Sequence, residues 1–179
     1  LMRIVAGKFR SRRIIAPNNL PVRPTTDMAK EALFNILNNS YYFEDLRVLD
    51  LFAGIGSISF EFASRGCPDI TAVDAHFGCI KFLDKTSKEL EIDLKTVKSD
   101  VFSFLEHNSQ SFDLIFADPP YDMETDKFLQ LCKLIFERKL LKPEGTLIIE
   151  HGKQTILSEH PKFERARKYG SNVFSFFKV

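Results

Sequence analysis

The stretch best suited to chemistry is Asp118-Pro119-Pro120-Tyr121, which directly follows the apolar run 112–117. Such a run is typical of a parallel strand buried on both faces, because these strands lose the polar alternation of exposed ones. The two prolines should end the strand, since neither has an N–H to give to a sheet ladder. The sequence therefore predicts a rigid corner with a carboxylate and an aromatic ring at a strand's carboxyl end, where open α/β sheets bind ligands.

This corner suits a planar nucleobase that carries an exocyclic amine. The base could stack on Tyr121, and its amine could donate hydrogen bonds to Asp118 and to the Pro119 carbonyl. Two acceptors would orient a weak nucleophile toward a methyl donor, and positioning of this kind can supply much of a rate. A Pro-Pro pair alone can also simply begin a helix. Asp-Pro-Pro-Tyr after an apolar strand is more specific, and it resembles the signature of amino-group methyltransferases that use S-adenosylmethionine.

A second candidate site follows the predicted strand 47–52. The turn 53–57 (Ala-Gly-Ile-Gly-Ser) comes next, then a helix to about residue 65, and its glycines would let a ligand approach the backbone closely. A Gly-x-Gly pair is weak on its own, and Ser59 stands where a dinucleotide fingerprint has its third glycine. No Walker lysine is present, so a P-loop is not predicted. With Asp50 before the turn, Asp-x-Phe-x-Gly-x-Gly resembles the first cofactor motif of S-adenosylmethionine enzymes.

Two further carboxylates follow later strands. Asp74 comes 20 residues after Gly54, at the end of the strand 69–73, and this spacing lets an acid reach a ribose hydroxyl pair. Asp100 follows the strand 94–98 and could accept from an adenine amine, with Val101 offering backbone contacts. Asp100 could equally cap the next helix, or do both.

The alternation of strand and helix from residue 46 onward predicts an α/β fold. We expect a doubly wound, Rossmann-like and mainly parallel sheet, formed by a domain at 25–179. Residues 140–145 should be a turn before a strand at 146–150, and an antiparallel hairpin at 162–179 should close the sheet. The glycine turn and the acidic strand ends would then meet at one edge.

The helix that begins after Thr25 and Thr26 has a core-facing stripe at i, i+3, i+4, i+7 and i+8. The stripe consists of Ala29, Ala32, Leu33, Ile36 and Leu37. The two threonines could simply cap this helix. Alternatively, they and the helix N-terminus could hold the carboxylate of a bound amino acid, such as the methionine end of the cofactor.

Basic residues gather at the N-terminus although the net charge is only +1. Residues 1–24 are predicted to form a β-hairpin around Gly7-Lys8 and a loop, and residues 1–23 contain no acid. This asymmetry suggests a polyanionic partner, although a basic chain end can also be only a solvated face. The candidate contacts are Arg3, Lys8, Arg10, Arg12, Arg13 and Arg23.

The composition of the 179 residues is ordinary for one globular domain. No apolar run reaches the roughly 18 residues of a membrane span, and no signal peptide is predicted. Three separated cysteines fit neither a disulfide framework nor a zinc site, so we expect buried free thiols and a cytoplasmic location. The histidines are scattered, and we predict no metal. We expect a monomer.

Several blocks together resemble the bacterial 16S ribosomal RNA guanine-N2 methyltransferase family, over nearly the whole chain. The blocks are residues 3–13, 23–35, 48–56 and 118–121, with Glu150-His151 and Tyr169-Gly170 near the end. The resemblance implies methylation of the N2 amine of a guanine in small-subunit ribosomal RNA, either naked or within the assembled subunit. Asp118 and Pro119 would hold the amine, and Tyr121 would stack on a flipped-out base.

The candidate sites can now be stated in full. The catalytic residues would be Asp118, Pro119, Pro120 and Tyr121. The residues that bind S-adenosyl-L-methionine would be Thr25, Thr26, Asp50, Phe52, Ala53, Gly54, Gly56, Asp74, Asp100 and Val101. No metal or covalent nucleophile is required, because the sulfonium is already a reactive electrophile.

Two rival interpretations stay open. The same chemistry could act on adenine-N6 in nucleic acid or on a protein glutamine. DNA enzymes of this type usually carry a separate recognition domain, and the glutamine enzymes normally show Asn where Asp118 stands. The second rival is a non-catalytic RNA-binding protein that keeps the fold, which would bind RNA without binding the cofactor.

Overall fold

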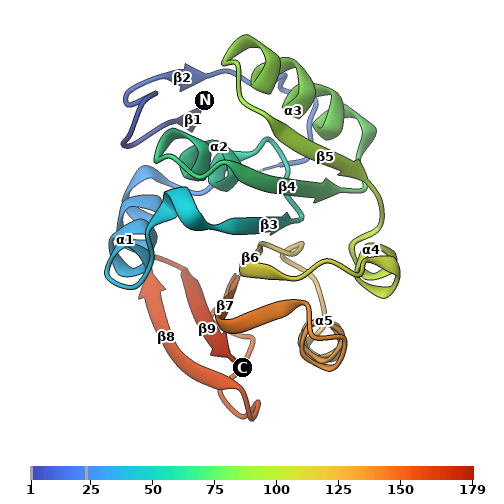
Figure 1. Cartoon of the computed structure of the whole chain (residues 1–179). Coiled ribbons are helices and arrows are strands. Elements are labelled where there is room, and N and C mark those ends of the chain that lie inside the picture. Colours follow the sequence, from blue (N-terminus) through green and yellow to red (C-terminus); the bar gives the residue numbers. More distant parts are fainter. Residues whose placement is uncertain (1, 23) are drawn as a thin grey trace.

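The computed structural model describes residues 2–22 and 24–179, and within them a seven-stranded sheet has the order β5-β4-β3-β6-β7-β9-β8 (Figure 1). Its strands are β3 (Arg47–Leu51), β4 (Asp69–Asp74), β5 (Leu94–Lys98), β6 (Phe112–Ala117), β7 (Leu141–Gly152), β8 (Phe163–Tyr169) and β9 (Asn172–Lys178). The first five strands in this order run parallel, and β9 is antiparallel to both β7 and β8. The predicted mainly parallel sheet with an antiparallel C-terminal hairpin is confirmed.

Helices cover both faces of the sheet (Figure 1). One face carries α1 (Asp27–Asn38), α2 (Ser57–Ser64) and α3 (Phe77–Glu89), and the other carries α4 (Val101–His107) and α5 (Thr125–Glu137). A short 3-10 helix, η1 (Phe43–Asp45), precedes β3. Val48 packs toward α1 and α2 while its neighbour Leu49 packs toward α4 and α5, so β3 is buried on both sides. In the described part of the chain, every helix is too short or too polar to cross a bilayer.

The predicted turn at 140–145 is wrong in its boundaries. β7 begins at Leu141, which pairs with Phe112, and pairing with β6 resumes at Thr146 opposite Leu114. The intervening residues bulge out of the ladder because Pro143 has no N–H and Glu144 has a φ of 69°. Tyr41 donates a hydrogen bond to the Glu144 carbonyl at 2.7 Å and so holds the bulge against the body of the protein.

The interior face of α1 is rotated from the predicted stripe. Its buried residues include Lys30 and Phe34, whereas Ala32 and Ile36 are only half-buried. The side chain of Lys30 is fully buried and forms an ion pair with Glu61 of α2, with Nζ and Oε1 3.6 Å apart. Burial lowers the pKa of Lys30, although the carboxylate of Glu61 opposes this shift. Lys30, paired with Glu61, therefore occupies a position on the interior face of α1 where an apolar residue would be expected.

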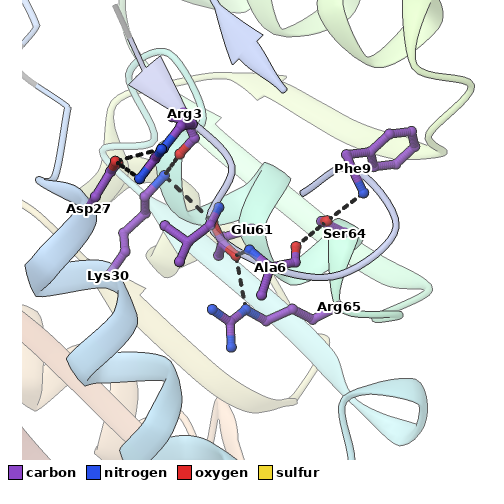
Figure 2. A network of polar contacts seen from close by, with 9 residues as sticks. Arg3, Ala6, Phe9, Asp27, Lys30, Glu61, Ser64 and Arg65 are labelled. Carbon is purple, nitrogen blue, oxygen red and sulfur yellow. Dashed lines mark hydrogen bonds and ion pairs between the residues drawn. The ribbon is translucent and has the colours of Figure 1, made fainter. Parts of the chain in front are cut away.

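The N-terminal hairpin is shorter than predicted because much of its backbone bonds to α2 instead of to itself. Its strands, β1 (Met2–Arg3) and β2 (Arg13–Ile14), pair antiparallel over two residues each. Between them, the backbone N–H of Val5 and that of Ala6 donate to the Glu61 carboxylate at 2.9 and 3.1 Å (Figure 2). Gly7 is required at the closest approach, since an added Cβ would lie 2.0 Å from the Ser64 carbonyl oxygen.

Glu61 is thus the centre of a buried network that joins three segments (Figure 2). Besides the two N–H groups and Lys30, it accepts a hydrogen bond from Arg65 Nε at 2.9 Å. Lys30 in turn donates to the Arg3 carbonyl at 2.6 Å. A charged residue between two phenylalanines, Phe60 and Phe62, was the available signal for this network.

Removing the negative charge at Glu61 should strongly destabilise the protein. We expect Glu61→Gln to lower the free energy of unfolding by about 3–5 kcal/mol, because Lys30 is left buried without its counter-charge. The measurement is urea denaturation at pH 7. A matched control, Asp27→Asn, removes the exposed ion pair with Arg3 and should cost less than about 1 kcal/mol. If the two variants lose similar free energies of unfolding, the buried network contributes no more to stability than the exposed ion pair does.

Candidate functional site

The carboxyl ends of four neighbouring strands are joined into one rim by backbone hydrogen bonds. The Asp118 N–H donates to the Leu51 carbonyl at 3.4 Å, the Ala53 N–H to the Val73 carbonyl at 3.0 Å, and the Ser99 N–H to the Asp74 carbonyl at 3.1 Å. These bonds link the end of β6 to β3, β3 to β4, and β4 to β5. The acidic corner and the glycine turn therefore share an edge, as the sequence predicted.

The glycine turn leaves β3 through backbone conformations that favour glycine. Gly54 and Gly56 have φ values of 58° and 84°, and Phe52 has a φ of 56°. A Cβ on Gly56 would lie 2.6 Å from the Leu83 side chain, so this position has no room for one. The Gly54 N–H donates to Asp74 Oδ2 at 2.9 Å, which fixes the turn against the end of β4.

Asp50 is buried beneath this turn and does not reach its surface. Only 2% of the residue is exposed, and its Oδ2 accepts a hydrogen bond from the Ser59 hydroxyl at 2.6 Å. Ser59, at the third-glycine position of the fingerprint, is thus the partner of this acid. Burial raises the pKa of Asp50 to about 7, and the hydrogen bond from Ser59 only partly offsets that effect.

Asp74 and Asp100 lie at the ends of β4 and β5. Asp74 is half-buried, and besides the Gly54 N–H it accepts the His76 N–H at 2.9 Å, so both carboxylate oxygens are held in place. Asp100 is exposed and caps α4 by accepting from the Ser103 N–H at 3.0 Å, while Val101 behind it is buried. The capping alternative for Asp100 is therefore confirmed, and its outer face stays open to a ligand.

The turn also fits a cofactor with a polar tail. Among the described residues, the buried side-chain atom without a hydrogen-bond partner is Ser57 Oγ, at the first position of α2. A helix N-terminus with an unpaired hydroxyl is suited to an anionic group such as a carboxylate. Ala53, at the start of the turn, is half-buried. The residues present thus match S-adenosylmethionine: a hydroxyl-binding acid, a glycine turn and an anion-binding helix end.

The Asp-Pro-Pro-Tyr corner divides between buried and exposed residues. Asp118 is half-exposed at the rim while Pro119 behind it is buried. Pro120 is exposed, and Tyr121 is 82% exposed, so its ring is free to receive a base. Burial, and then the negative charges of Glu150 and Asp50, raise the pKa of Asp118 well above its usual value.

Glu150 is a neighbouring acid to which the sequence analysis gave no role. It lies near the end of β7, one position beyond Ile149, which pairs with Ala117 just before Asp118. Only 5% of Glu150 is exposed, and its carboxylate accepts hydrogen bonds from Asn172 at 2.8 Å and Thr25 at 3.3 Å. Burial raises the pKa of Glu150 despite these hydrogen bonds. An acid that follows the apolar run 147–149 was the available signal.

The two threonines before α1 already have protein partners. Thr26 is the N-cap, and its hydroxyl accepts from the Ala29 N–H at 3.2 Å. Thr25 donates to Glu150, so it borders the Asp118 corner. In the described residues, no three His, Cys, Asp or Glu side chains are grouped so that they could hold a metal ion.

The predicted basic contacts are exposed but dispersed. Arg3, Lys8, Arg10, Arg12 and Arg13 are all exposed, and Arg23 lies outside the described residues. Arg3 is paired with Asp27 at 2.9 Å. Lys8 lies beside the C-terminal end of α2, because its backbone N–H donates to the Ser64 carbonyl at 2.7 Å. The structure brings Arg12 and Arg13 close to α3, and it leaves Lys8 at the opposite end of α2 from the glycine turn.

Comparison with known proteins gives matches along nearly the whole chain. The family model described as Conserved hypothetical protein 95 matches residues 2–178. Ribosomal RNA small subunit methyltransferase D of Haemophilus influenzae is 33% identical over a 188-residue alignment, which covers 98% of this chain and 91% of that protein. The protein of the same name from Buchnera aphidicola (Baizongia pistaciae) is 30% identical over 150 residues, 83% of this chain and 75% of that one. The solved structure of a hypothetical protein from Thermus thermophilus has a TM-score of 0.86 at 26% identity and covers both chains completely.

The buried Asp50 should make stability fall as pH rises. Its pKa of about 7 lies above the ordinary value of 3.8, so the folded protein keeps a proton that the unfolded chain releases. The free energy of unfolding should therefore decrease between about pH 4 and 7, by up to about 1.4 kcal/mol per pH unit. Asp50→Asn should lack this contribution.

The measurement is urea denaturation of the wild type and the variant at four pH values from about 4.5 to about 7.5, which cover most of the interval between the two pKa values. Asp93→Asn, at an exposed acid before β5, is the control and should follow the wild type. If the curves for wild type and Asp50→Asn run parallel, Asp50 does not titrate as its burial requires.

Proposed function

The chain belongs to the family described as Conserved hypothetical protein 95, and we propose that it methylates the exocyclic N2 amine of a guanine in 16S ribosomal RNA. The coarser activity, S-adenosylmethionine-dependent rRNA methylation, follows from the family, the Rossmann-like fold and relatives at 30% identity or more. The guanine, its N2 atom and the residues that act on it are the proposal. Because the substrate is ribosomal RNA, we place the enzyme in the cytoplasm.

The observation that carries the choice of guanine is the pair of adjacent carboxyl groups, Asp118 and Glu150, at the ends of β6 and β7. The pairing edge of guanine presents the N1–H and N2–H donors side by side, whereas adenine presents an acceptor at N1. Carboxylates in a poorly hydrated corner therefore favour guanine, because adenine would leave a buried acceptor facing another acceptor. Tyr121, exposed beside them, provides the stacking surface for a base that has left its helix.

The chain's own residues then position the amine and receive its proton. When bound, S-adenosylmethionine supplies a methyl carbon on a positively charged sulfur. Asp118 and the Pro119 carbonyl would orient the N2 lone pair of the guanine toward that carbon, for its transfer from sulfur to nitrogen. The nitrogen must then lose a proton. Asp118 can accept it near neutral pH, since burial and neighbouring charges raise its pKa.

Asp118→Ala should abolish methyl transfer while leaving cofactor affinity within a few fold. Loss of an oriented acceptor and proton acceptor should lower kcat by about 10²–10⁴-fold. The assay transfers labelled methyl groups to small ribosomal subunits from cells that lack the enzyme, and calorimetry reports cofactor binding. Asp122→Ala, at an exposed acid nearby, is the control.

Digestion of the labelled RNA identifies the product. Label in N2-methylguanosine supports the proposal. Label in N6-methyladenosine or in protein glutamine would contradict the choice of guanine, and near-normal turnover by Asp118→Ala would remove that residue from the chemistry. Absence of cofactor binding by the wild type, with RNA binding retained, would favour the non-catalytic alternative.

Glu150→Gln should move the pH dependence of the reaction. The charge of Glu150 helps to raise the pKa of Asp118, so its removal lowers that pKa. The acidic limb of the kcat against pH profile should therefore shift to lower pH, because Asp118 becomes an ionised acceptor earlier. Glutamine keeps an oxygen for the Thr25 hydroxyl, but it turns an NH2 group toward the Asn172 NH2 and so loses that hydrogen bond.

The matched control is Glu124→Gln, at an exposed acid before α5. Its profile should coincide with that of the wild type. A Glu150→Gln enzyme with reduced kcat but an unmoved acidic limb would indicate a purely structural role for Glu150.

A further inference from the structure

A groove of about 700 Å³ runs between the N-terminal segment and α3, away from the Asp118 corner. One wall consists of residues 12–17 with Asn19 and Leu20, and the other consists of one side of α3. Figure 1 shows the chain that follows β2 passing beside α3. The sequence analysis gave no role to α3.

The charged lining of this groove is predominantly positive. Arg12 and Arg13 contribute from the N-terminal side, Lys81 and Lys85 contribute from α3, and Glu89 is the single acid among the lining residues. Lys81 and Lys85 are one helical turn apart and therefore face the same way. In the described part of the chain, none of these four cations has a carboxylate within ion-pair distance. Their charges are thus available to an external anion.

The floor of the groove is apolar. Ile14, Phe82 and Leu90 are buried there, and Leu20 is half-buried. Ile15 projects from the edge with 78% of its surface exposed. Cations that flank an apolar floor are suited to single-stranded nucleic acid, because phosphates can pair with the cations while the base faces contact the apolar surface.

One end of the groove lies near the glycine turn, because Val22, two residues after the lining residue Leu20, packs beside Gly54. α3 spans 13 residues, about 20 Å, and the groove follows it from Leu90 to Gly78. Gly78 lies two residues after His76, whose N–H is bound by Asp74 at the rim. Leu20, on the opposite wall, lies close to Gly78, since a Cβ there would lie 2.8 Å from the Leu20 side chain. A strand that leaves the groove at this end reaches the cofactor side of the rim.

We propose that the groove between residues 12–20 and α3 holds a single-stranded stretch of the substrate RNA next to the nucleotide that is modified. This inference rests on the proposed function for the nature of the substrate. Lys81 and Lys85 pair with phosphates from one wall, and Arg12 and Arg13 pair from the other. The groove thereby guides the strand toward the rim where the cofactor is bound.

The test reverses the charge of both α3 lysines, in Lys81→Glu/Lys85→Glu. Binding to a labelled fragment of small-subunit ribosomal RNA and to whole small subunits is measured at several salt concentrations. We expect affinity for both to fall by about 10-fold or more at about 0.1 M salt, and the slope of log K against log salt to fall in magnitude by about 1.4, for two lost contacts with single-stranded phosphates.

Methyl transfer by the same variant distinguishes binding from chemistry. KM for RNA should rise in step with the loss of affinity, while kcat at saturating RNA and cofactor affinity by calorimetry should stay within about two-fold. Should the charge-reversed protein fail to fold, Lys81→Gln/Lys85→Gln applies the same test with a smaller expected effect.

The matched control is Lys133→Glu/Lys139→Glu, which makes the same charge change at exposed positions on and after α5, on the other face of the sheet. It should bind RNA nearly as the wild type does. Equal losses in the two double variants would overturn the inference, because only net charge would then matter. A loss for whole subunits without a loss for the RNA fragment would also overturn it, and would indicate a ribosomal protein in the groove.

The experiments distinguish an error in the role of the groove from an error in the proposed function. If the wild type methylates guanine but the α3 variant binds RNA normally, only the groove is wrong. If the wild type modifies another group while the α3 variant still loses RNA affinity, the groove holds and the guanine assignment fails.

Discussion

The buried carboxylate of Glu61 joins the N-terminal segment to α2, the helix that follows the glycine turn. It lies on α2, whose N-terminus forms the glycine turn and whose inner side contributes Ser59 to Asp50. The same helix binds the N-terminal segment through Glu61 and Ser64, whose hydroxyl accepts the Phe9 N–H at 2.9 Å. One eight-residue helix thus places a cofactor turn at one end and a basic hairpin along its outer surface. A desolvated charge is costly, and this one is tolerated because two N–H groups and two cations surround it.

The rim presents the opposite electrostatic situation, because its acids have no cation beside them among the described residues. Asp50, Asp118 and Glu150 lie close enough for their charges to interact, and burial raises the pKa of each. Such a site opposes ionisation until a positive ligand or hydrogen-bond donors arrive. A sulfonium cofactor and the N–H groups of the proposed guanine would supply both, so binding should stabilise the folded protein as well as prepare the reaction. The arrangement of these acids is therefore more stable with the ligands bound than in the empty site.

The elements whose signal is local could be predicted from the sequence. Strand β6 and the corner after it follow from an apolar run and two prolines, and the shared rim follows from parallel strand order. Contacts between distant segments could not be predicted in this way. Lys30 and Glu61 are far apart in the chain, and no pattern on α1 reveals that a lysine will find a buried partner on α2. Residues 140–145 resemble a turn locally, but pairing with β6 at Leu141 and again at Thr146 makes residues 142–145 a bulge within β7. The site residues remain predictions, since their geometry permits their roles without testing them.

The N-terminal segment borders each part of the candidate site in turn, so under the proposed function it would join RNA recognition to catalysis. Residues 5–9 bind α2, residues 12–20 form a wall of the basic groove, and Val22 packs 3.2 Å from where a Cβ of Gly54 would lie. Thr25 then donates to Glu150 beside Asp118. Because this segment contacts both the groove and the glycine turn, a strand of RNA in the groove would press on the same residues that cover the turn. Substrate and cofactor should therefore influence each other's binding through this segment, and the coupling must be equal in both directions.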